Sequence, residues 1–421
     1  MRNVWKNIIV CLLVAAIFLM PIHAVDILQD KVTNTQMNGG WYKTFGGEDD
    51  ERFRWVEQTS DGGYIVAGDT KSIGAGDKDG WLIKTDADGN EQWSITLGGT
   101  GWDGFGCVQQ LVDGGFIACG WYHTGGDPGW EPWLVRTDSN GNIIFEKRYA
   151  EPGFKGEFTN VRVTSDGGYV MTGIDFSEGG FTFTNALIAK TDAAGNLLWM
   201  KTYGTSTNYE PIVFGSFEIT PDGGYIAVSA VYGGDAGTYA WLIKTDAEGT
   251  IEWEKTFAHN PPFGSQLYCL GLTTDGGCIL GGNCGLFYFG IGGCNIWITK
   301  TDDSGNMEWE QTLGIPMMFS DICLCARQTA DGGYILTGTA YGIGGFLVNK
   351  AAANPVQSKI GIYKLSENGD LEWNQFIQGT GEGLCIKQTT DGGYIVAGYT
   401  GNENEGGDGV LAKLDSNGNI N

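Results

Sequence analysis

The chain has 421 residues, of which 70 are glycine, and 25 Lys and Arg residues against 50 Asp and Glu residues give a formal net charge of −25 at pH 7. A surface of that sign cannot neutralise phosphates, which argues against a nucleic-acid partner. The many glycines and the 18% of charged residues are typical of a turn-rich, all-β protein.

The first residues, 1–24, have the pattern of an export signal. A basic start precedes an apolar run at 8–20, and a small-residue cleavage site follows at 22–24. The run has 13 residues, which is short for a membrane-spanning helix. The alternative is an uncleaved anchor, so membrane contact is expected only if this segment is retained. We predict a secreted or cell-surface protein in which residues 25–38 are a linker.

From residue 39 onward the sequence repeats. An Asp-Gly-Gly step occurs seven times, and its first and last copies lie 330 residues apart over six intervals, a mean period of 55. A fixed period of this size indicates a repeat architecture, and we predict one domain over 39–421. The copies begin at Asp61, Asp113, Asp166, Asp222, Asp275, Asp331 and Asp391.

Each repeat holds four runs rich in Val, Ile, Tyr, Trp and Thr, at 53–59, 64–69, 80–86 and 91–97 in the first repeat. Runs one and two meet at Asp-Gly-Gly, and runs three and four meet at an Asp-x-x-Gly-Asn step. Both junctions suit tight hairpins, which need residues that accept positive φ. Four antiparallel strands repeated seven times, without a helical pattern, predict an all-β, seven-bladed β-propeller.

The two ends of the chain predict how the ring closes. The last repeat stops before its fourth run, and residues 41–46, Trp-Tyr-Lys-Thr-Phe-Gly, carry the missing sequence. We expect this N-terminal strand to close the last blade by pairing with 410–415, which removes exposed strand edges. A large ring recurs in the fourth run, as blade-on-blade packing requires. These rings are Trp93, Phe145, Trp199, Trp253, Trp309 and Trp373.

A cation recurs once per repeat in the third run, beside a recurring aspartate. We interpret it as a structural pair between neighbouring blades. The seven cations are Lys84, Arg136, Lys190, Lys244, Lys300, Lys364 and Lys413.

Nine of the ten cysteines follow the signal segment, because Cys11 lies within it. Four of them share one position, six residues before the Asp of Asp-Gly-Gly, on the innermost strand of their blades. A metal or redox site around the channel is one interpretation, and a small buried side chain where blades converge is the favoured one. Cys284 and Cys294 flank a loop and are candidates for a disulfide in an exported protein. The four are Cys107, Cys269, Cys325 and Cys385.

The two faces of the predicted ring differ. Asp-Gly-Gly and Asp-x-x-Gly-Asn turns barely change on one face, whereas the strand two–three loops and blade links of the other face differ in every repeat. Function usually resides on such loops. Flat aromatic surfaces suit sugar rings or a protein partner, although rings can also pack between blades. The expected ligand-binding residues are Trp102, Trp121, Tyr122, Trp130, Tyr232 and Tyr288.

The residue patterns that most catalytic and metal sites require do not occur in this sequence. The two histidines after the signal, His123 and His259, have no metal-ligand spacing, and no Gly-x-Ser-x-Gly or phosphate-binding loop occurs. We therefore predict no metal, no cofactor and no assigned catalytic residue. Glycoside hydrolysis needs only two carboxylates, and loop residues such as Asp103 and Glu131 could supply them, without any pair being singled out.

The sequences Asp-Gly-Gly-Tyr-Ile, Trp-Leu-Ile-Lys-Thr-Asp and Gly-Asn-x-x-Trp resemble those of exported prokaryotic β-propeller repeat proteins. These are described as lipoprotein-like or quinoprotein-like proteins of unknown function, sometimes under glucanase-type labels. The resemblance covers residues 41–421, implies the propeller fold and transfers no catalytic residue. Quinoprotein dehydrogenases resemble eight-bladed rings, so seven repeats do not imply a quinone cofactor.

We expect an exported, non-catalytic binding or surface-interaction propeller whose ligand is a glycan or a protein at the variable-loop face. The alternative is a glucanase-like, carbohydrate-active hydrolase that uses paired carboxylates on that face. A structural envelope component without a ligand is the third possibility.

Overall fold

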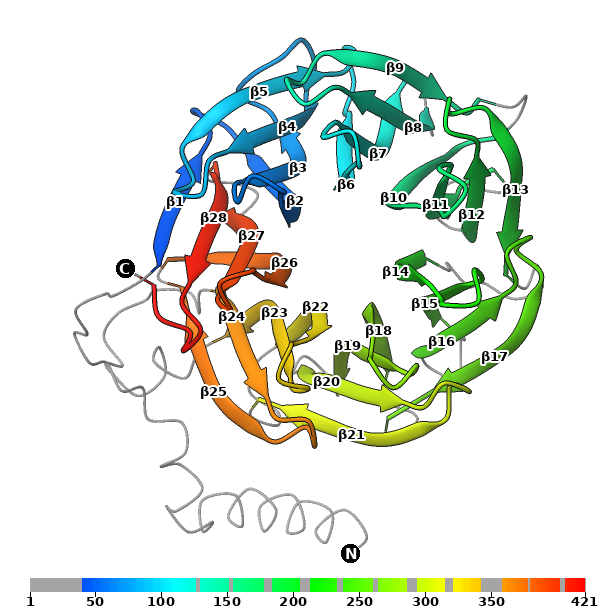
Figure 1. Cartoon of the computed structure of the whole chain (residues 1–421), viewed down its shortest axis with the longest axis vertical. Helices are drawn as coiled ribbons and strands as arrows, with labels where there is room; N and C mark the ends of the chain where they lie inside the picture. Colours follow the sequence, from blue (N-terminus) through cyan, green and yellow to red (C-terminus); the bar gives the residue numbers. More distant parts are fainter. Residues whose placement is uncertain are drawn as a thin grey trace, which may run out of the picture. The chain divides into compact units, whose positions relative to one another are not determined.

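The protein is described by a computed structural model in which the chain from residue 40 onward forms a ring of β-sheets (Figure 1). Every regular secondary-structure element assigned within the described residues is a β-strand. The described part contains no helix of the length and apolarity that crossing a membrane needs. The structure describes residues 40–125, 129–150, 154–177, 184–204, 213–232, 238–259, 264–285, 294–314, 321–341, 358–377, 379–401 and 406–420.

Seven sheets of four antiparallel strands make up the ring, which confirms the predicted seven-bladed propeller. The first strand of each blade lies innermost, and the last runs along the rim (Figure 1). Blade one is β2 Glu51–Gln58, β3 Tyr64–Thr70, β4 Asp79–Thr85 and β5 Glu91–Leu97. Blade two is β6 Gly104–Gln110, β7 Phe116–His123, β8 Trp130–Thr137 and β9 Ile143–Arg148. Blade three is β10 Gly156–Val163, β11 Tyr169–Asp175, β12 Asn185–Thr191 and β13 Leu197–Tyr203.

The later blades repeat the same order. Blade four is β14 Val213–Ile219, β15 Tyr225–Tyr232, β16 Thr238–Thr245 and β17 Ile251–Phe257. Blade five is β18 Ser265–Leu272, β19 Cys278–Gly285, β20 Cys294–Thr301 and β21 Met307–Leu313. Blade six is β22 Ile322–Gln328, β23 Tyr334–Tyr341, β24 Ser358–Leu365 and β25 Leu371–Phe376. Blade seven is β26 Gly381–Gln388, β27 Tyr394–Thr400, β28 Gly409–Leu414 and β1 Trp41–Phe45.

The last blade takes its outermost strand from the start of the chain, as predicted. β1 pairs antiparallel with β28 from Trp41 opposite Lys413 to Phe45 opposite Gly409. The sheet order is β1-β28-β27-β26, and β26 contacts the inner strand β2 of blade one. The ring is therefore closed by hydrogen bonds between the two ends of the polypeptide, which leaves β28 with a partner on both sides.

The recurring turns are built by aspartate side chains that accept backbone hydrogen bonds. Asp61 accepts from Gly63 N at 3.0 Å and from Thr59 Oγ1 at 2.5 Å, and Gly62 takes a φ of 85°. Asp86 accepts from the backbone and side-chain nitrogens of Asn90, both at 2.8 Å. These contacts explain why only the Asp, Gly and Asn of each turn persist among the repeats.

The recurring cation forms its ion pair within a blade, so the inter-blade interpretation is wrong. Lys84 on β4 lies opposite Ile65 on β3, close to the Asp-Gly-Gly turn, and its Nζ is 2.9 Å from Asp61 Oδ2. The pair ties the third strand to the first hairpin of the same sheet. The other pairs are Arg136–Asp113, Lys190–Asp166, Lys244–Asp222, Lys300–Asp275, Lys364–Asp331 and Lys413–Asp391.

The recurring aromatic ring provides the contact between blades. The Trp41 indole lies against Gly89 in the turn of the next blade, where a Cβ would come within 2.5 Å of the indole, and its Nε1 donates to Ala87 O at 3.2 Å. The turn position therefore requires glycine for two reasons. Its φ is 72°, and the indole leaves no room for a Cβ atom. The same packing joins Trp93 to Gly141, Phe145 to Gly195, Trp199 to Gly249, Trp253 to Gly305, Trp309 to Gly369 and Trp373 to Gly418.

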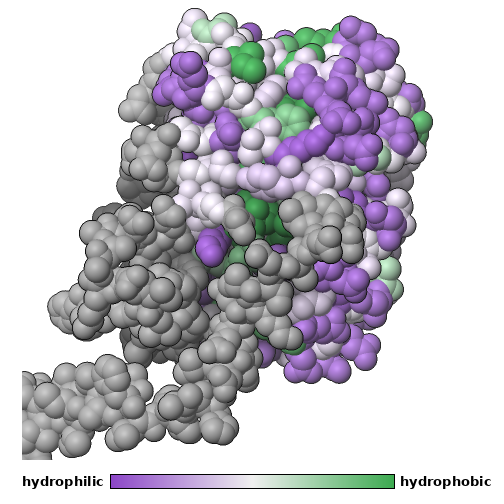
Figure 2. Space-filling model, turned by 90° about the vertical axis from the view of Figure 1, so that its left-hand side faces the viewer, coloured by the Kyte–Doolittle hydropathy of each residue, from purple (hydrophilic) through white to green (hydrophobic). Residues whose placement is uncertain are grey.

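Hydrophilic side chains cover much of the described surface seen in Figure 2, with small apolar patches between them. Buried residues form the sheets themselves, and β3 and β4 are buried along their whole length.

The glycine under the indole gives a matched pair of variants. Gly305→Ala places a Cβ 2.5 Å from the Trp253 indole at a φ of 74°, whereas Gly223→Ala, at a φ of 86°, meets nothing within 4 Å. We expect Gly223→Ala to lower the free energy of unfolding by roughly 1–2 kcal/mol from backbone strain alone. Gly305→Ala should cost about 1–3 kcal/mol more, because the indole must move. Urea unfolding measures both, and equal losses would contradict the packing role.

The Asp–Lys pairs predict a loss of stability in acid. The hydrogen bonds from Lys244 and Thr220 lower the pKa of Asp222 to about 2 from its ordinary value of 3.8. Between these pH values the folded chain binds fewer protons than the unfolded chain. The stabilisation is therefore present above about pH 4 and is lost as the pH falls through about 2.

Urea midpoints should fall between about pH 6, which lies above that window, and about pH 2.5, which lies within it. A Lys244→Met variant should show a smaller fall than the parent protein, since the pKa of Asp222 then returns toward its ordinary value. An unchanged pH dependence in Lys244→Met would show that this pair contributes nothing to the acid sensitivity.

Candidate functional site

Two of the predicted ligand-binding residues lie together on the variable-loop face. Trp102, in the link between β5 and β6, is 41% exposed, and its ring centroid is 6.5 Å from that of Trp130 at the start of β8. Trp130 Nε1 donates to Trp102 O at 3.3 Å, and the His123 ring lies 5.1 Å from the Trp130 ring. The β5–β6 link and the facing ends of β7 and β8 therefore form one aromatic surface.

A cation from the first blade completes this surface. Lys78 Nζ, in the loop between β3 and β4, lies 5.3 Å from the centre of the Trp102 ring. The backbone of Asp103 donates to Lys78 O at 2.8 Å, which fixes the blade link against that loop. We name Lys78, Trp102, His123 and Trp130 the Trp102 patch. It offers an exposed indole with an imidazole beside it and with Lys78, whose Nζ also pairs with the buried Asp69 at 3.3 Å.

Two other predicted residues, Trp121 and Tyr122, are not in this patch. Trp121 is 7% exposed, and the Arg54 guanidinium lies 4.8 Å from its ring. Tyr122 is half-buried, with the Trp133 ring at 5.7 Å and the Arg148 guanidinium at 4.4 Å. These two rings pack on their neighbours, which is the alternative given for the aromatic loops.

Tyr288 and the side chain of Tyr232 lie outside the described residues, so their role in binding stays a prediction.

The carboxylates near the patch hold loops in place. Asp103 is buried and accepts from Gly99 N and His123 N, both at 2.6 Å. Burial raises the pKa of Asp103 despite these two bonds. Glu131 lies 3.7 Å from Arg148. Both groups are committed to structural contacts, whereas a hydrolytic pair must face a cleft. Four more loop carboxylates, Asp127, Asp235, Glu403 and Glu405, lie outside the described residues.

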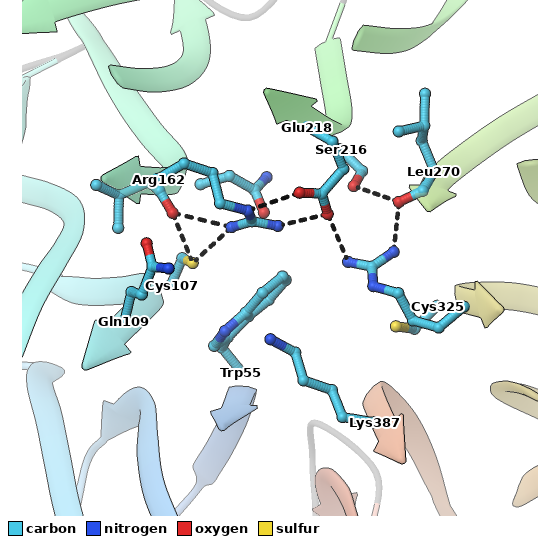
Figure 3. A network of polar contacts seen from close by, with 12 residues as sticks. Trp55, Cys107, Gln109, Arg162, Ser216, Glu218, Leu270, Cys325 and Lys387 are labelled. Carbon is cyan, nitrogen blue, oxygen red and sulfur yellow. Dashed lines mark hydrogen bonds and ion pairs between the residues drawn. The ribbon is translucent and has the colours of Figure 1, made fainter. Parts of the chain in front are cut away.

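A second cluster lies in the central channel, and the sequence analysis did not find it (Figure 3). It uses the position four residues before each Asp-Gly-Gly aspartate, which falls near the end of every inner strand. Seven strands bring these positions to one level around the ring axis, and we name them the channel ring. They are Glu57, Gln109, Arg162, Glu218, Gly271, Arg327 and Lys387.

One carboxylate of the channel ring serves two guanidinium groups. Arg162 donates from Nε and Nη2 to the two oxygens of Glu218, at 2.9 and 2.8 Å. Arg327 Nη2 lies 3.5 Å from Glu218 Oε1. Burial would raise the pKa of Glu218, but the charge and hydrogen bonds of Arg162 lower it to about 2. Glu218 is therefore ionised at neutral pH.

Trp55 of β2 projects into the channel, as Figure 3 shows, and three cations surround its ring. Lys387 Nζ is 4.5 Å from the ring centroid, and the guanidinium carbons of Arg162 and Arg327 are 4.9 and 5.8 Å away. Lys387 also pairs with Glu57 Oε1 at 2.6 Å. At this level of the channel an indole therefore lies within a group of charges.

The cysteines beside the ring are buried, as expected where blades converge. Cys107, Cys325 and Cys385 donate to backbone carbonyls of the next blade at 3.6 to 3.8 Å. Ser216 makes the same contact to Leu270 O at 3.2 Å. These side chains supply donors to the inner-strand edges, which have no neighbouring strand.

The other interpretations of the cysteines have less support. Within the described residues, no group of three or more His, Cys, Asp or Glu could hold a metal ion. The Cys294 side chain lies outside the described residues, so its disulfide with Cys284 stays a prediction.

Comparison with solved structures supports the propeller fold. The chain is similar to the polysaccharide lyase Uly1 with a TM-score of 0.54 and 10% identity, over 92% of this chain and 94% of that one. The structure of YCF48 bound to D1 peptide has a TM-score of 0.51 and 12% identity, over 89% of this chain and 96% of that one. A protein of unknown function from Dyadobacter fermentans has a TM-score of 0.50 and 11% identity, over 90% of this chain and 98% of that one.

At such identities these similarities show the fold alone. No protein-family model matches the sequence, and no curated protein matches it either.

Proposed function

We propose that the protein is an exported, non-catalytic binding propeller that holds a glycan on its variable-loop face at the Trp102 patch. The observation that carries this proposal is the exposed Trp102 ring, which is 41% accessible and is supported by residues from two blades. An exposed indole on a fixed backbone offers the flat apolar surface on which a sugar ring stacks.

The patch is preorganised, which favours binding without a change of shape. Asp103 fixes the blade link by accepting from Gly99 N, and it fixes the end of β7 by accepting from His123 N. Lys78 and His123 place a cation and a hydrogen-bonding ring beside the indole. A ligand therefore pays little for ordering these loops.

The non-catalytic part of the proposal rests on how the nearby carboxylates are used. Asp79 is 3% exposed and accepts from Ala75 N and Gly76 N at 2.8 and 3.0 Å. Asp103 is fully buried. Neither Asp79 nor Asp103 is placed to protonate a leaving group or to attack a sugar. A glycan would be held at this patch without being cleaved.

A protein partner is the other ligand class that an aromatic patch suits. Among structures of similar fold, one is a polysaccharide lyase and another is bound to a peptide, so both ligand classes are compatible with such a ring.

Replacing the exposed indole should abolish most of the binding. A glycan array with the purified protein selects the best oligosaccharide, and titration calorimetry then compares Trp102→Ala with the parent. We expect about tenfold weaker binding, because the stacking of one sugar ring on the indole contributes roughly 1–2 kcal/mol to the free energy of binding. Leu198→Ala is the control, since Leu198 is 56% exposed on the outer strand β13.

Three results would overturn the proposal. Equal affinity of Trp102→Ala and parent would move the ligand away from the patch. An array without binding, together with a protein partner that Trp102→Ala loses, would replace the glycan by a protein. Release of reducing sugar from the bound glycan would make the protein a hydrolase.

A further inference from the structure

We propose that the channel ring is a binding site for a small carboxylate anion, held by Arg327 and Lys387 beside the Trp55 ring. This site is separate from the Trp102 patch. The channel ring lies toward the Asp-Gly-Gly face, because its residues are near the ends of the inner strands. The patch lies at the opposite ends of strands, on the variable-loop face.

The first argument is the balance of charge. The channel ring contains three cations, Arg162, Arg327 and Lys387, and two carboxylates, Glu57 and Glu218. The excess of one positive charge occurs in a chain whose formal net charge is −25. A cation held away from bulk water is costly unless an anion or a set of hydrogen bonds compensates it.

Arg327 is the cation left without a carboxylate of its own. Arg162 takes both oxygens of Glu218 in a bidentate pair, and Lys387 takes Glu57. Among the described residues, Glu218 is the only carboxylate within ion-pair distance of Arg327, at 3.5 Å. Within the described part of the chain, the other hydrogen bonds of Arg327 go to the carbonyls of Ala326 and Leu270, both through Nη1. These carbonyls bring no net charge.

Glycine at one ring position sets where Arg327 lies. Blade five contributes Gly271, and a Cβ there would come within 3.3 Å of Arg327 Cδ. Arg327 can therefore extend across blade five to Leu270 O and reach Glu218 of blade four. A side chain at position 271 would crowd this path. Glycine at position 271 thus leaves room for the Arg327 side chain between blade six and Glu218 of blade four.

The cations converge on one place that solvent reaches. The Arg327 guanidinium and Lys387 Nζ lie 5.8 and 4.5 Å from the same Trp55 ring centroid. Their side chains keep 15% and 24% of their exposure. Figure 3 shows Lys387 and Trp55 pointing toward the Arg162–Glu218 pair from the other side of the channel. An anion entering along the axis would meet both cations together.

The chemistry of these groups selects the ligand. A guanidinium presents paired N–H donors that match the two oxygens of a carboxylate, and an ammonium adds a third donor. An excess of one charge fits a singly charged ligand.

One internal group could compete with an added anion. The hydrogen bond from Cys385, and then the charge of Arg327, lower the pKa of the Cys325 thiol against the effect of burial. A Cys325 thiolate would itself balance Arg327, and the channel ring would then need no ligand. A Cys325→Ser variant separates this account from the proposal, because serine keeps the hydrogen bond without the charge.

Acetate is the probe for the test, with the full chain at a fixed ionic strength of about 0.15 M, so that chloride replaces acetate without changing charge screening. Titration calorimetry and the thermal unfolding midpoint are measured together. We expect saturable acetate binding and a rising midpoint, neither of which chloride reproduces. Arg327→Gln should weaken binding about tenfold or more, since a charge-assisted hydrogen bond is lost.

Two further variants keep the result interpretable. Lys255→Gln also removes one cation, from an exposed site on β17, and should bind acetate like the parent. If Arg327→Gln does not fold, Lys387→Gln supplies the same comparison, with the thermal midpoint without acetate as the check on folding. Cys325→Ser should bind acetate within about twofold of the parent, a difference of roughly 0.4 kcal/mol.

Three results would overturn the proposal. They are equal effects of acetate and chloride on the parent, unchanged acetate affinity in Arg327→Gln, and acetate binding that appears only in Cys325→Ser. None of them bears on the Trp102 patch, so this site and the proposed glycan site succeed or fail independently.

Discussion

The ring depends on a single contact that every blade makes with the next. An aromatic side chain of the outermost strand lies on the turn glycine of the following sheet. Except in blade five, where Cys278 follows Asp-Gly-Gly, the residue after that step is a tyrosine or phenylalanine that packs on the same ring, as Tyr64 does with Trp41 at 5.8 Å. The contact needs a flat ring on one blade and a missing side chain on the other. Since both belong to the same repeat, a blade of this sequence packs on another copy of itself.

Most of the fold could be predicted because the same strand and turn sequences recur in every repeat. The number of blades, the strands and the closing N-terminal strand follow from period and composition. The partner of the recurring cation did not follow, although the signal was present. Lys84 stands opposite Ile65, two residues after Gly63, so hairpin register alone places it beside Asp61. Spacing along the chain suggested a neighbouring blade, and pairing across the strands decides otherwise.

The channel ring was harder to predict for a physical reason. Its residues differ among repeats, from Glu57 to Gly271, so a comparison of repeats treats the position as unremarkable variation. Their meaning arises only when inner strands from far-apart repeats converge on one axis. A charged residue at a constant distance before Asp-Gly-Gly in five repeats was the available sign. The Trp102 patch was partly predictable, because exposed loops were identified, but which rings turn outward depends on packing.

The closing strand has a mechanical consequence. Trp41 faces Lys413, so the polypeptide enters and leaves the β1–β28 ladder at the same end. A force that draws the two termini apart would load these hydrogen bonds one after another, as in opening a zip, and not all at once. The other six sheets contain no terminus and would bear that tension only after β1 had peeled away. A pulling force applied through the N-terminus therefore acts on the β1–β28 pairing, which is the contact whose loss opens the ring.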